Sequence, residues 1–344
     1  MDTNESPATD LGFPGTAKLA AILKPYLGHR AFLIPLTDAR GRRLGNNGDA
    51  LMHHVMMSIL RDMGITVEQD PRNADVLMVP PNGALLQNYV VPSLLEERLQ
   101  ILPDIPLVVL PSSAYFPTAD PSSIFRGRSA STTWILREPY SFNHLRENWG
   151  PQLHAAGVTL HLDHDVVASG HDYASKVLGP AESGQYLLIA ARTDVEAATI
   201  SATLPRNPAW YVVKRAVYFA MRIVLPQRAL ASLVRRKRQS RQRKSANSLL
   251  SRLPNETLDE LNESDLPSVT LDVSDPSVAS FNEYRDYIRS AALVVTDRLH
   301  VGMAAATLGK RVILVEAGYH KLGGVYHQSL TAVTNVAFVD RAKP

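Results

Sequence analysis

The sequence predicts an α/β protein with two domains, each built on a parallel sheet. Its 344 residues provide enough chain for two domains of ordinary size. Short apolar runs, typical of buried parallel strands, recur along the chain and alternate with segments of helical apolar spacing. A stretch rich in glycine, serine and polar residues, 169–184, is typical of a domain boundary. We therefore expect an N-terminal domain at 17–180 and a C-terminal domain at 181–344.

The composition excludes several classes of protein. There is no cysteine, which excludes a disulfide framework, a thiolate nucleophile and a cysteine-based zinc site and is consistent with the cytoplasm. Residues 1–16 are polar and carry acidic side chains, so we expect a disordered tail and no secretory signal. No apolar run is long enough to span a bilayer.

The N-terminal domain opens with a predicted βαβ unit. Residues 31–36 predict a strand, the glycine-rich stretch 41–49 a loop, residues 50–62 a helix and 65–68 a second strand. Glycines allow the backbone to approach a ligand closely, so a phosphate or a sugar can sit at this loop. The glycine spacing matches neither the dinucleotide pattern nor the nucleoside-triphosphate pattern, and a tight structural turn is the alternative.

The rest of this domain continues the alternation of strands and helices. Further strands are expected at 75–80, 107–110, 132–136 and 158–162, and helices at 93–102 and 141–149. Arg137 stands where a strand ends before a helix, and a surface pair with Glu138 is its alternative role. His161, His164 and Asp165 fit no helix-borne metal motif. For these three residues we predict a loop linking the domains, and no metal.

The C-terminal domain shows the same pattern of elements. The expected strands are 186–191, 268–273, 292–295, 311–316 and 336–339, with a helix at 278–290 and a glycine-bearing loop at 318–324. Arg192 follows the first of these strands, so it is another arginine at a strand end. Ligands bind at the carboxyl ends of strands in open α/β sheets, which makes this edge the expected site.

The strand 292–295 leads into the most informative part of the sequence. Thr296 and Asp297 have the right chemistry to cap the helix that follows. Arg298 and the helix amides predict an anion site, and His300 adds a group that can move a proton near neutral pH. The alternative is that Arg298 pairs with Asp297 or Glu316 and that His300 is an ordinary helix residue.

Charge is unevenly distributed along the chain. Residues 206–244 hold twelve Lys and Arg and no Asp or Glu, which leaves 24 basic against 33 acidic residues elsewhere, a net charge near −9. The protein is therefore acidic apart from one basic segment. For this reason the overall charge of +3 is no indication that the protein binds nucleic acid. Aromatic and aliphatic residues accompany the charges, so 206–250 reads as a basic amphipathic insertion, although Pro226 argues against one unbroken helix.

Three short motifs resemble the polysaccharide pyruvyl transferase family. They are Thr-Asp-Arg-Leu-His at 296–300, Gly-Tyr-His-Lys at 318–321 and Gly-Asn-Asn-Gly-Asp at 45–49. The resemblance implies two Rossmann-like domains in a GT-B-like arrangement, with the site in the interdomain cleft. Family members often carry an Arg followed by a Ser where this chain has Arg137 and Ser141. Many have a glycine cluster where this chain has Pro-Asn-Gly at 81–83, which puts the backbone path there in doubt.

The resemblance implies transfer of a pyruvyl group from phosphoenolpyruvate to a sugar as a ketal, with no other cofactor. Phosphoenolpyruvate carries a phosphate and a carboxylate, and both suit the arginine fork. The expected donor-binding residues are Arg137, Arg192, Arg298 and Lys321. His300 is expected to act as general acid and base, and Asp49 to accept a proton or bind sugar. The expected acceptor or backbone-loop residues are Asn46, Asn47, Gly48 and Asn82.

Two other functions remain open at this level. A GT-B-like glycosyltransferase would use the same cationic residues for the diphosphate of a nucleotide sugar. A non-catalytic polyanion-binding protein would be built on the basic run 235–244, but that run has no base-stacking aromatics, and we expect no nucleic acid partner. The resemblance implies a lipid-linked glycan acceptor, so we expect a cytoplasmic protein that docks on the inner face of the inner membrane through its basic segment.

Overall fold

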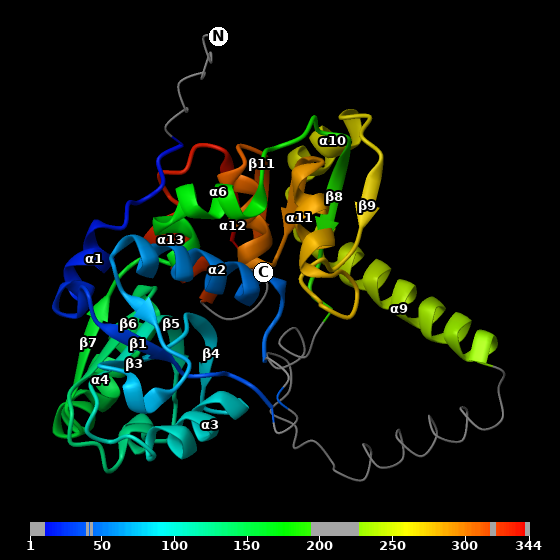
Figure 1. Ribbon diagram of the computed structural model, residues 1–344. Helices are drawn as coiled ribbons and strands as arrows, with labels where there is room; N and C mark the ends of the chain where they lie inside the picture. Colours follow the sequence, from blue (N-terminus) through cyan, green and yellow to red (C-terminus); the bar gives the residue numbers. More distant parts are fainter. Residues whose placement is uncertain (1–10, 39–40, 42–43, 194–226, 317–320, 341–344) are drawn as a thin grey trace.

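The computed structural model describes residues 11–38, 41, 44–193, 227–316 and 321–340, with the backbone alone for 227–237. Its strands form two separate sheets, and every strand pairing in this part of the chain is parallel (Figure 1). The predicted α/β class with two parallel sheets is confirmed.

The first sheet has the strand order β2-β1-β3-β5-β6-β7, and β4 pairs with the far part of β5. Its strands are β1 (Arg30–Leu33), β2 (Thr66–Val67), β3 (Val76–Val79), β4 (Asn82–Leu86), β5 (Leu107–Tyr115), β6 (Thr132–Leu136) and β7 (Val158–Leu162). The helices of this half are α1 (Ala17–Leu23), α2 (Asn47–Asp62), α3 (Val90–Leu99) and α4 (Pro139–Ala155), with short 3₁₀ turns η1 (Lys24–Tyr26), η2 (Pro71–Asn73) and η3 (Pro121–Phe125). Helices α5 (Val166–Ser169) and α6 (His171–Leu178) then lead towards the second sheet.

The second sheet has the order β12-β11-β10-β8-β9. Its strands are β8 (Tyr186–Ala190), β9 (Ser268–Thr270), β10 (Ala291–Thr296), β11 (Arg311–Val315) and β12 (Val336–Val339). Its helices are α9 (Gln227–Leu250), α10 (Asn255–Glu263), α11 (Phe281–Arg289), α12 (Leu299–Thr307) and α13 (Lys321–Ser329). None of the described helices is both long and apolar enough to cross a bilayer.

Helices of the two halves pack on one another and share a core. Helix α2 contacts α5, α6, α11 and α12, which lie beside it in Figure 1. Met52 and Val55 of α2 are buried in the same apolar cluster as Val301 and Met303 of α12. Burial of this surface is the main favourable term in folding, so it also fixes α2 relative to α12. The predicted domain boundary near residue 180 stays a prediction.

Several elements differ from those predicted. Strand β5 runs to Tyr115 rather than to residue 110, because its far part, from Ser112 to Tyr115, pairs with β4. Helix α13 begins at Lys321, inside the stretch predicted to be a loop. The backbone nitrogen of Gly323, on its first turn, donates to the Glu316 carboxylate at 2.7 Å. A hydrogen bond from a backbone nitrogen to a carboxylate seven residues earlier leaves no periodic signal in the sequence.

The N-terminal segment also differs from prediction over the residues that the structure describes. Phe13 stacks on His171 with ring centroids 4.9 Å apart, and the backbone nitrogen of Thr334 donates to the Leu11 oxygen. Residues 11–16 therefore pack against the body of the protein, and the expectation of a disordered tail is wrong for them. Residues 1–10 lie outside the described part of the chain.

Candidate active site

The buried guanidinium of Arg137 is the centre of the candidate site. Arg137 follows β6 directly and is fully buried. Its Nε donates to Ser113 Oγ at 2.8 Å, and its Nη1 donates to Asp165 Oδ2 at 2.7 Å. Its Nη2 is also buried, but it has no hydrogen-bond partner among the described residues. Asp165, and not the neighbouring Glu138, is thus the carboxylate that pairs with Arg137, and one cationic N–H group remains to be satisfied.

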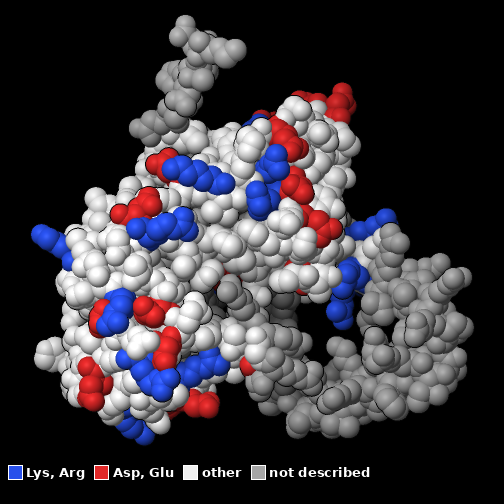
Figure 2. Space-filling model, in the orientation of Figure 1, with Lys and Arg blue, Asp and Glu red and all other residues white. Residues whose placement is uncertain are grey.

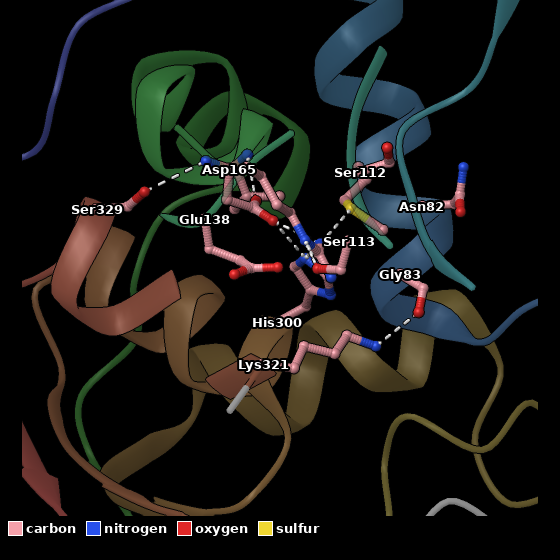
Figure 3. Close-up of polar contacts among 12 residues, drawn as sticks. Asn82, Gly83, Ser112, Ser113, Glu138, Asp165, His300, Lys321 and Ser329 are labelled. Atoms are coloured by element: carbon pink, nitrogen blue, oxygen red, sulfur yellow. Dashed lines mark hydrogen bonds and ion pairs between the residues drawn. The ribbon is translucent and has the colours of Figure 1, made fainter. Parts of the chain in front are cut away.

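A second cationic group, the ammonium of Lys321, lies close to Arg137 beside the backbone of Gly83. Lys321 Nζ donates to the Gly83 oxygen at 2.9 Å (Figure 3). A Cβ built at Gly83 would lie 2.4 Å from Lys321 Nζ and 2.6 Å from Arg137 Nη2, so the two nitrogens are close neighbours. Like charges at such a separation repel, and an anion bound by both would relieve this repulsion. A side chain at position 83 would fill the same space.

His300 completes the cluster. Its Nε2 lies 3.3 Å from Asp165 Oδ2 and 3.4 Å from Arg137 Nη1, and its side chain is only 11% exposed. On the other side of the ring, a Cβ at Gly48 would lie 2.7 Å from His300 Cβ and 3.0 Å from its Nδ1. The two motifs from opposite ends of the chain are therefore in contact, and Gly48 is small enough to leave room for the imidazole.

Asp165 is the residue that sequence reasoning missed. It is fully buried and caps α5, accepting from the Val167 nitrogen through Oδ1. Its Oδ2 serves both Arg137 and His300. Burial alone would raise the pKa of Asp165, but the charges of His300 and Arg137 and the hydrogen bonds outweigh burial, so its pKa lies well below the usual range. The only sequence signal was local, an Asp preceding a short apolar helix.

The glycine-rich motif at 45–49 acts mainly through its own backbone. Asn46 and Asp49 form a capping box at the start of α2, where Asp49 Oδ2 accepts from the Asn46 nitrogen at 2.8 Å. Asn47 donates through Nδ2 to the Val273 and Ala279 oxygens, both at 2.8 Å, and so ties α2 to the second half of the chain. The predicted contacts of Asp49, Asn46 and Asn47 with substrate stay predictions.

Asn82 has a similar local role at the start of β4. Its Nδ2 donates to the Pro80 oxygen at 2.9 Å, and its Oδ1 accepts from the Ala84 nitrogen at 3.0 Å. These bonds fix the backbone around Gly83, whose oxygen accepts the hydrogen bond from Lys321 Nζ. The Pro-Asn-Gly sequence thus leads into strand β4, and the Asn82 side chain fixes the backbone beside Gly83, which Lys321 contacts.

Arg298 belongs to a neighbouring, mostly buried ion-pair cluster. Its Nη2 lies 2.6 Å from Asp272 Oδ2 and its Nε lies 3.1 Å from Asp272 Oδ1, so within the described part of the chain its ion-pair partner is Asp272 rather than the Asp297 or Glu316 of the alternative. Asp297 does not cap α12. Its Oδ1 accepts from the Arg192 nitrogen at 2.7 Å, and burial raises its pKa. The donor-binding roles of Arg192 and Arg298 stay predictions.

The residues weighed as metal ligands are separated by their contacts. His164 Nδ1 lies 3.2 Å from Ser329 Oγ, whereas Asp165 turns to Arg137. Over the described ranges there is no group of three or more His, Asp and Glu side chains that could hold a metal ion.

Comparison with known proteins supports the motif at 296–300. Residues 191–318 match the model of the polysaccharide pyruvyl transferase family. This part of the chain carries the pyruvyl transferase pattern. The predicted resemblance is confirmed over that stretch, which contains Arg192, Arg298 and His300, and the family implies a transferase. Arg137, Lys321 and the motif at 45–49 lie outside the matched residues.

Solved structures add information on the fold alone. A functionally uncharacterised protein of Klebsiella pneumoniae is 16% identical, with a TM-score of 0.52. The match covers 94% of this chain and 97% of that one. It supports the α/β fold with parallel sheets and carries no information on chemistry. No curated protein matches the sequence.

The geometry is suited to the chemistry of a pyruvyl transferase. Two cationic groups converge on one place, and an imidazole lies 3.4 Å from one of them. A buried carboxylate holds both the guanidinium and the imidazole in position. The cluster can therefore bind a small anion and exchange a proton with it.

Proposed function

We propose that the protein transfers the pyruvyl group of phosphoenolpyruvate to a sugar of an exopolysaccharide or of its lipid-linked precursor, forming a ketal. The observation that carries this proposal is the buried Arg137 Nη2, which has no hydrogen-bond partner among the described residues and lies next to Lys321 Nζ. Phosphoenolpyruvate is a compact dianion or trianion, and a guanidinium with an ammonium matches its phosphate and carboxylate. The imidazole of His300 beside them gives this site acid–base chemistry as well as binding.

The reaction needs one proton delivered to carbon and two removed from hydroxyl groups. His300 gives its proton to the methylene carbon of the enol, which leaves an oxocarbenium-like centre. A sugar hydroxyl attacks that centre and its proton returns to His300. Phosphate then leaves and a second hydroxyl closes the ketal, its proton departing with the phosphate. Arg137 and Lys321 hold the anion, and Asp165 positions both Arg137 and His300.

The other predicted site residues fit into this scheme as further proposals. Arg192 and Arg298 would add positive charge at the donor from the second sheet. Asp49 would accept a proton from the sugar or bind it, and Asn46, Asn47, Gly48 and Asn82 would shape the acceptor side through the backbone.

Removing either cation should weaken donor binding. For Arg137→Ala and Lys321→Ala we expect the dissociation constant for phosphoenolpyruvate to rise about ten- to a hundredfold, because a charge-assisted hydrogen bond is lost in each. Calorimetric titration with phosphoenolpyruvate measures this. Arg146→Ala, which removes an exposed arginine of α4, is the matched control. Unchanged donor affinity in both variants would place the donor elsewhere.

The reaction itself is tested by phosphate release. Purified protein is incubated with phosphoenolpyruvate and a panel of lipid-linked and free glycans, and inorganic phosphate is measured. A parallel panel of nucleotide sugars tests the glycosyltransferase alternative, for which the same cations would hold a diphosphate. Turnover with nucleotide sugars and none with phosphoenolpyruvate would favour that alternative.

A basic surface on α9 supports a location at an anionic membrane. Arg238, Arg241, Arg243 and Lys244 are exposed, and blue side chains project in Figure 2 where Figure 1 places α9. The opposite face of the same helix is buried, with Gln242, Ala246 and Leu249 against the second sheet. The apolar face of α9 in this region is thus buried inside the protein. Contact with a membrane would therefore be made by the exposed basic side chains and would be electrostatic. Residues 206–226 lie outside the described residues.

Neutralising this surface should abolish membrane binding. Each Lys or Arg near an anionic bilayer contributes about 1 kcal/mol. We expect the protein to sediment with anionic vesicles at low salt and not with neutral ones. Changing the seven basic residues of 235–244 to Gln should release it, while turnover on a soluble acceptor stays unchanged. Equal binding of the variant would contradict the proposal.

A further inference from the structure

Two aromatic side chains stay exposed although most large apolar residues are buried. Tyr115 is 48% exposed and Tyr140 is 51% exposed. They are the only aromatic rings among the exposed large hydrophobic residues in the described part of the chain. About half of each tyrosine therefore faces solvent, and this exposed part is a flat apolar surface that ends in a polar hydroxyl.

The two tyrosines belong to one continuous surface. Tyr115 ends β5 and packs on His144 of α4, with ring centroids 4.6 Å apart. Tyr140 precedes His144 by four residues on the same helix, so the two side chains lie on one face. The elements are joined by the Ala114 nitrogen, which donates to Ser141 Oγ, and by the Phe116 nitrogen, which donates to His144 Nε2. We call Tyr115, His144 and Tyr140 the aromatic strip.

The aromatic strip lies next to the anion site. Ser113, which binds Arg137, is two residues before Tyr115 on β5, and residues two apart point to the same face of a strand. Arg137 itself is three residues before Tyr140. On the other side, a Cβ at Gly324 would lie 2.8 Å from Tyr140 Cδ2, and Gly324 is one helical turn after Lys321. Three elements thus connect the strip to the residues that hold the anion.

We propose that the aromatic strip is the acceptor subsite, on which the pyranose that receives the pyruvyl group stacks. A pyranose has a face of C–H groups and a rim of hydroxyls, which matches flat rings that carry polar tips. Aromatic rings have little affinity for a phosphate or a carboxylate. We therefore assign the neutral sugar to the aromatic strip and the anionic donor to Arg137 and Lys321. The hydroxyls at the rim of a stacked sugar would then face the bound donor. This inference rests on the proposed function.

The test is to remove the rings and vary each substrate separately. For Tyr115→Ala and Tyr140→Ala we expect the acceptor KM to rise about three- to tenfold each, because one aromatic contact is lost. The KM for phosphoenolpyruvate should stay unchanged. Tyr115→Phe and Tyr140→Phe keep the ring, so these variants should retain most of the affinity for the acceptor. Ile101→Ala, an exposed apolar residue after α3, is the control for loss of exposed apolar surface.

Direct glycan binding separates failure of this inference from failure of the proposed function. Saturation-transfer NMR with the same glycan panel detects acceptor binding without turnover. An unchanged acceptor KM, or unchanged glycan binding, in the Tyr115→Ala/Tyr140→Ala double variant overturns the aromatic strip as the subsite. Absence of phosphate release from phosphoenolpyruvate with every glycan overturns the proposed function. In that case loss of glycan binding in the double variant would still support a sugar-binding strip.

Discussion

Replacing His300 by alanine is expected to lower turnover by about two to four orders of magnitude, because the reaction loses the group that protonates the enol carbon. His300 is the imidazole beside the two cations, and its Nε2 faces both Arg137 and Asp165. Phosphoenolpyruvate binding should change far less, since Arg137 and Lys321 remain. Single-turnover phosphate release and donor titration measure the two effects separately.

The matched control for this variant is His154→Ala, which removes an exposed histidine near the end of α4. We expect both variants to unfold at nearly the wild-type temperature. A His300→Ala protein with near-normal turnover would show that His300 is only a helix residue that packs on Gly48.

The site residues that lie at the ends of strands could be predicted from the sequence. Arg137 and His300 follow or lie just beyond apolar runs, and the carboxyl ends of parallel strands gather at one edge of a sheet. That rule predicts the edge of its own sheet at which each residue lies, the first sheet for Arg137 after β6 and the second sheet for His300 after β10. It does not predict their partners, because the partners come from far along the chain.

Asp165 and Gly83 illustrate what a sequence pattern leaves out. Asp165 is 28 residues from Arg137 and 135 from His300, and Lys321 is 238 residues from Gly83. Contacts at such separations depend on how the two sheets pack, which no local periodicity encodes. The sequence around Asp165 predicts only a loop linking the domains, and the Pro-Asn-Gly stretch leaves the backbone path there in doubt.

The motif at 45–49 shows the converse case, a local signal that has a structural role in addition to the ligand role predicted for it. Asn46 and Asp49 have the three-residue spacing of a capping box, and the structure places them in one. Gly48 then contacts His300, so the motif contributes to the site by leaving space. A pattern of polar residues at a helix start is therefore first to be tested as a cap.

Changing Asp165 to asparagine is expected to impair the site and the fold together. Asn at this position can still cap α5 through its oxygen, so the change isolates the loss of charge. The buried guanidinium of Arg137 would then lack its counterion. Removing one partner of a buried ion pair lowers the free energy of unfolding by about 3–5 kcal/mol. The His300 ring would lose the carboxylate that orients it. We expect weaker donor binding, slower turnover and a lower free energy of unfolding.

The pH dependence of unfolding distinguishes a charge effect from simple loss of packing. The pKa of Asp165 is held below its usual value in the folded protein, because the nearby charges and hydrogen bonds outweigh burial. The stability that Asp165 contributes is then fully present above its unfolded pKa of about 3.9 and is lost as pH falls below that value. Urea unfolding of wild type and Asp165→Asn should show a clear difference in stability at neutral pH, and the difference should disappear in acid.

Asp163→Asn is the control in the same loop. Asp163 is as buried as Asp165, but both of its carboxylate oxygens have no hydrogen-bond partner among the described residues, and burial raises its pKa. Neutralising it should leave stability at neutral pH unchanged or increase it, because burial makes the charged form of Asp163 less favourable in the folded protein than in the unfolded chain. Donor affinity should not change. If Asp165→Asn behaves like Asp163→Asn in both stability and donor affinity, Asp165 does not position the anion site.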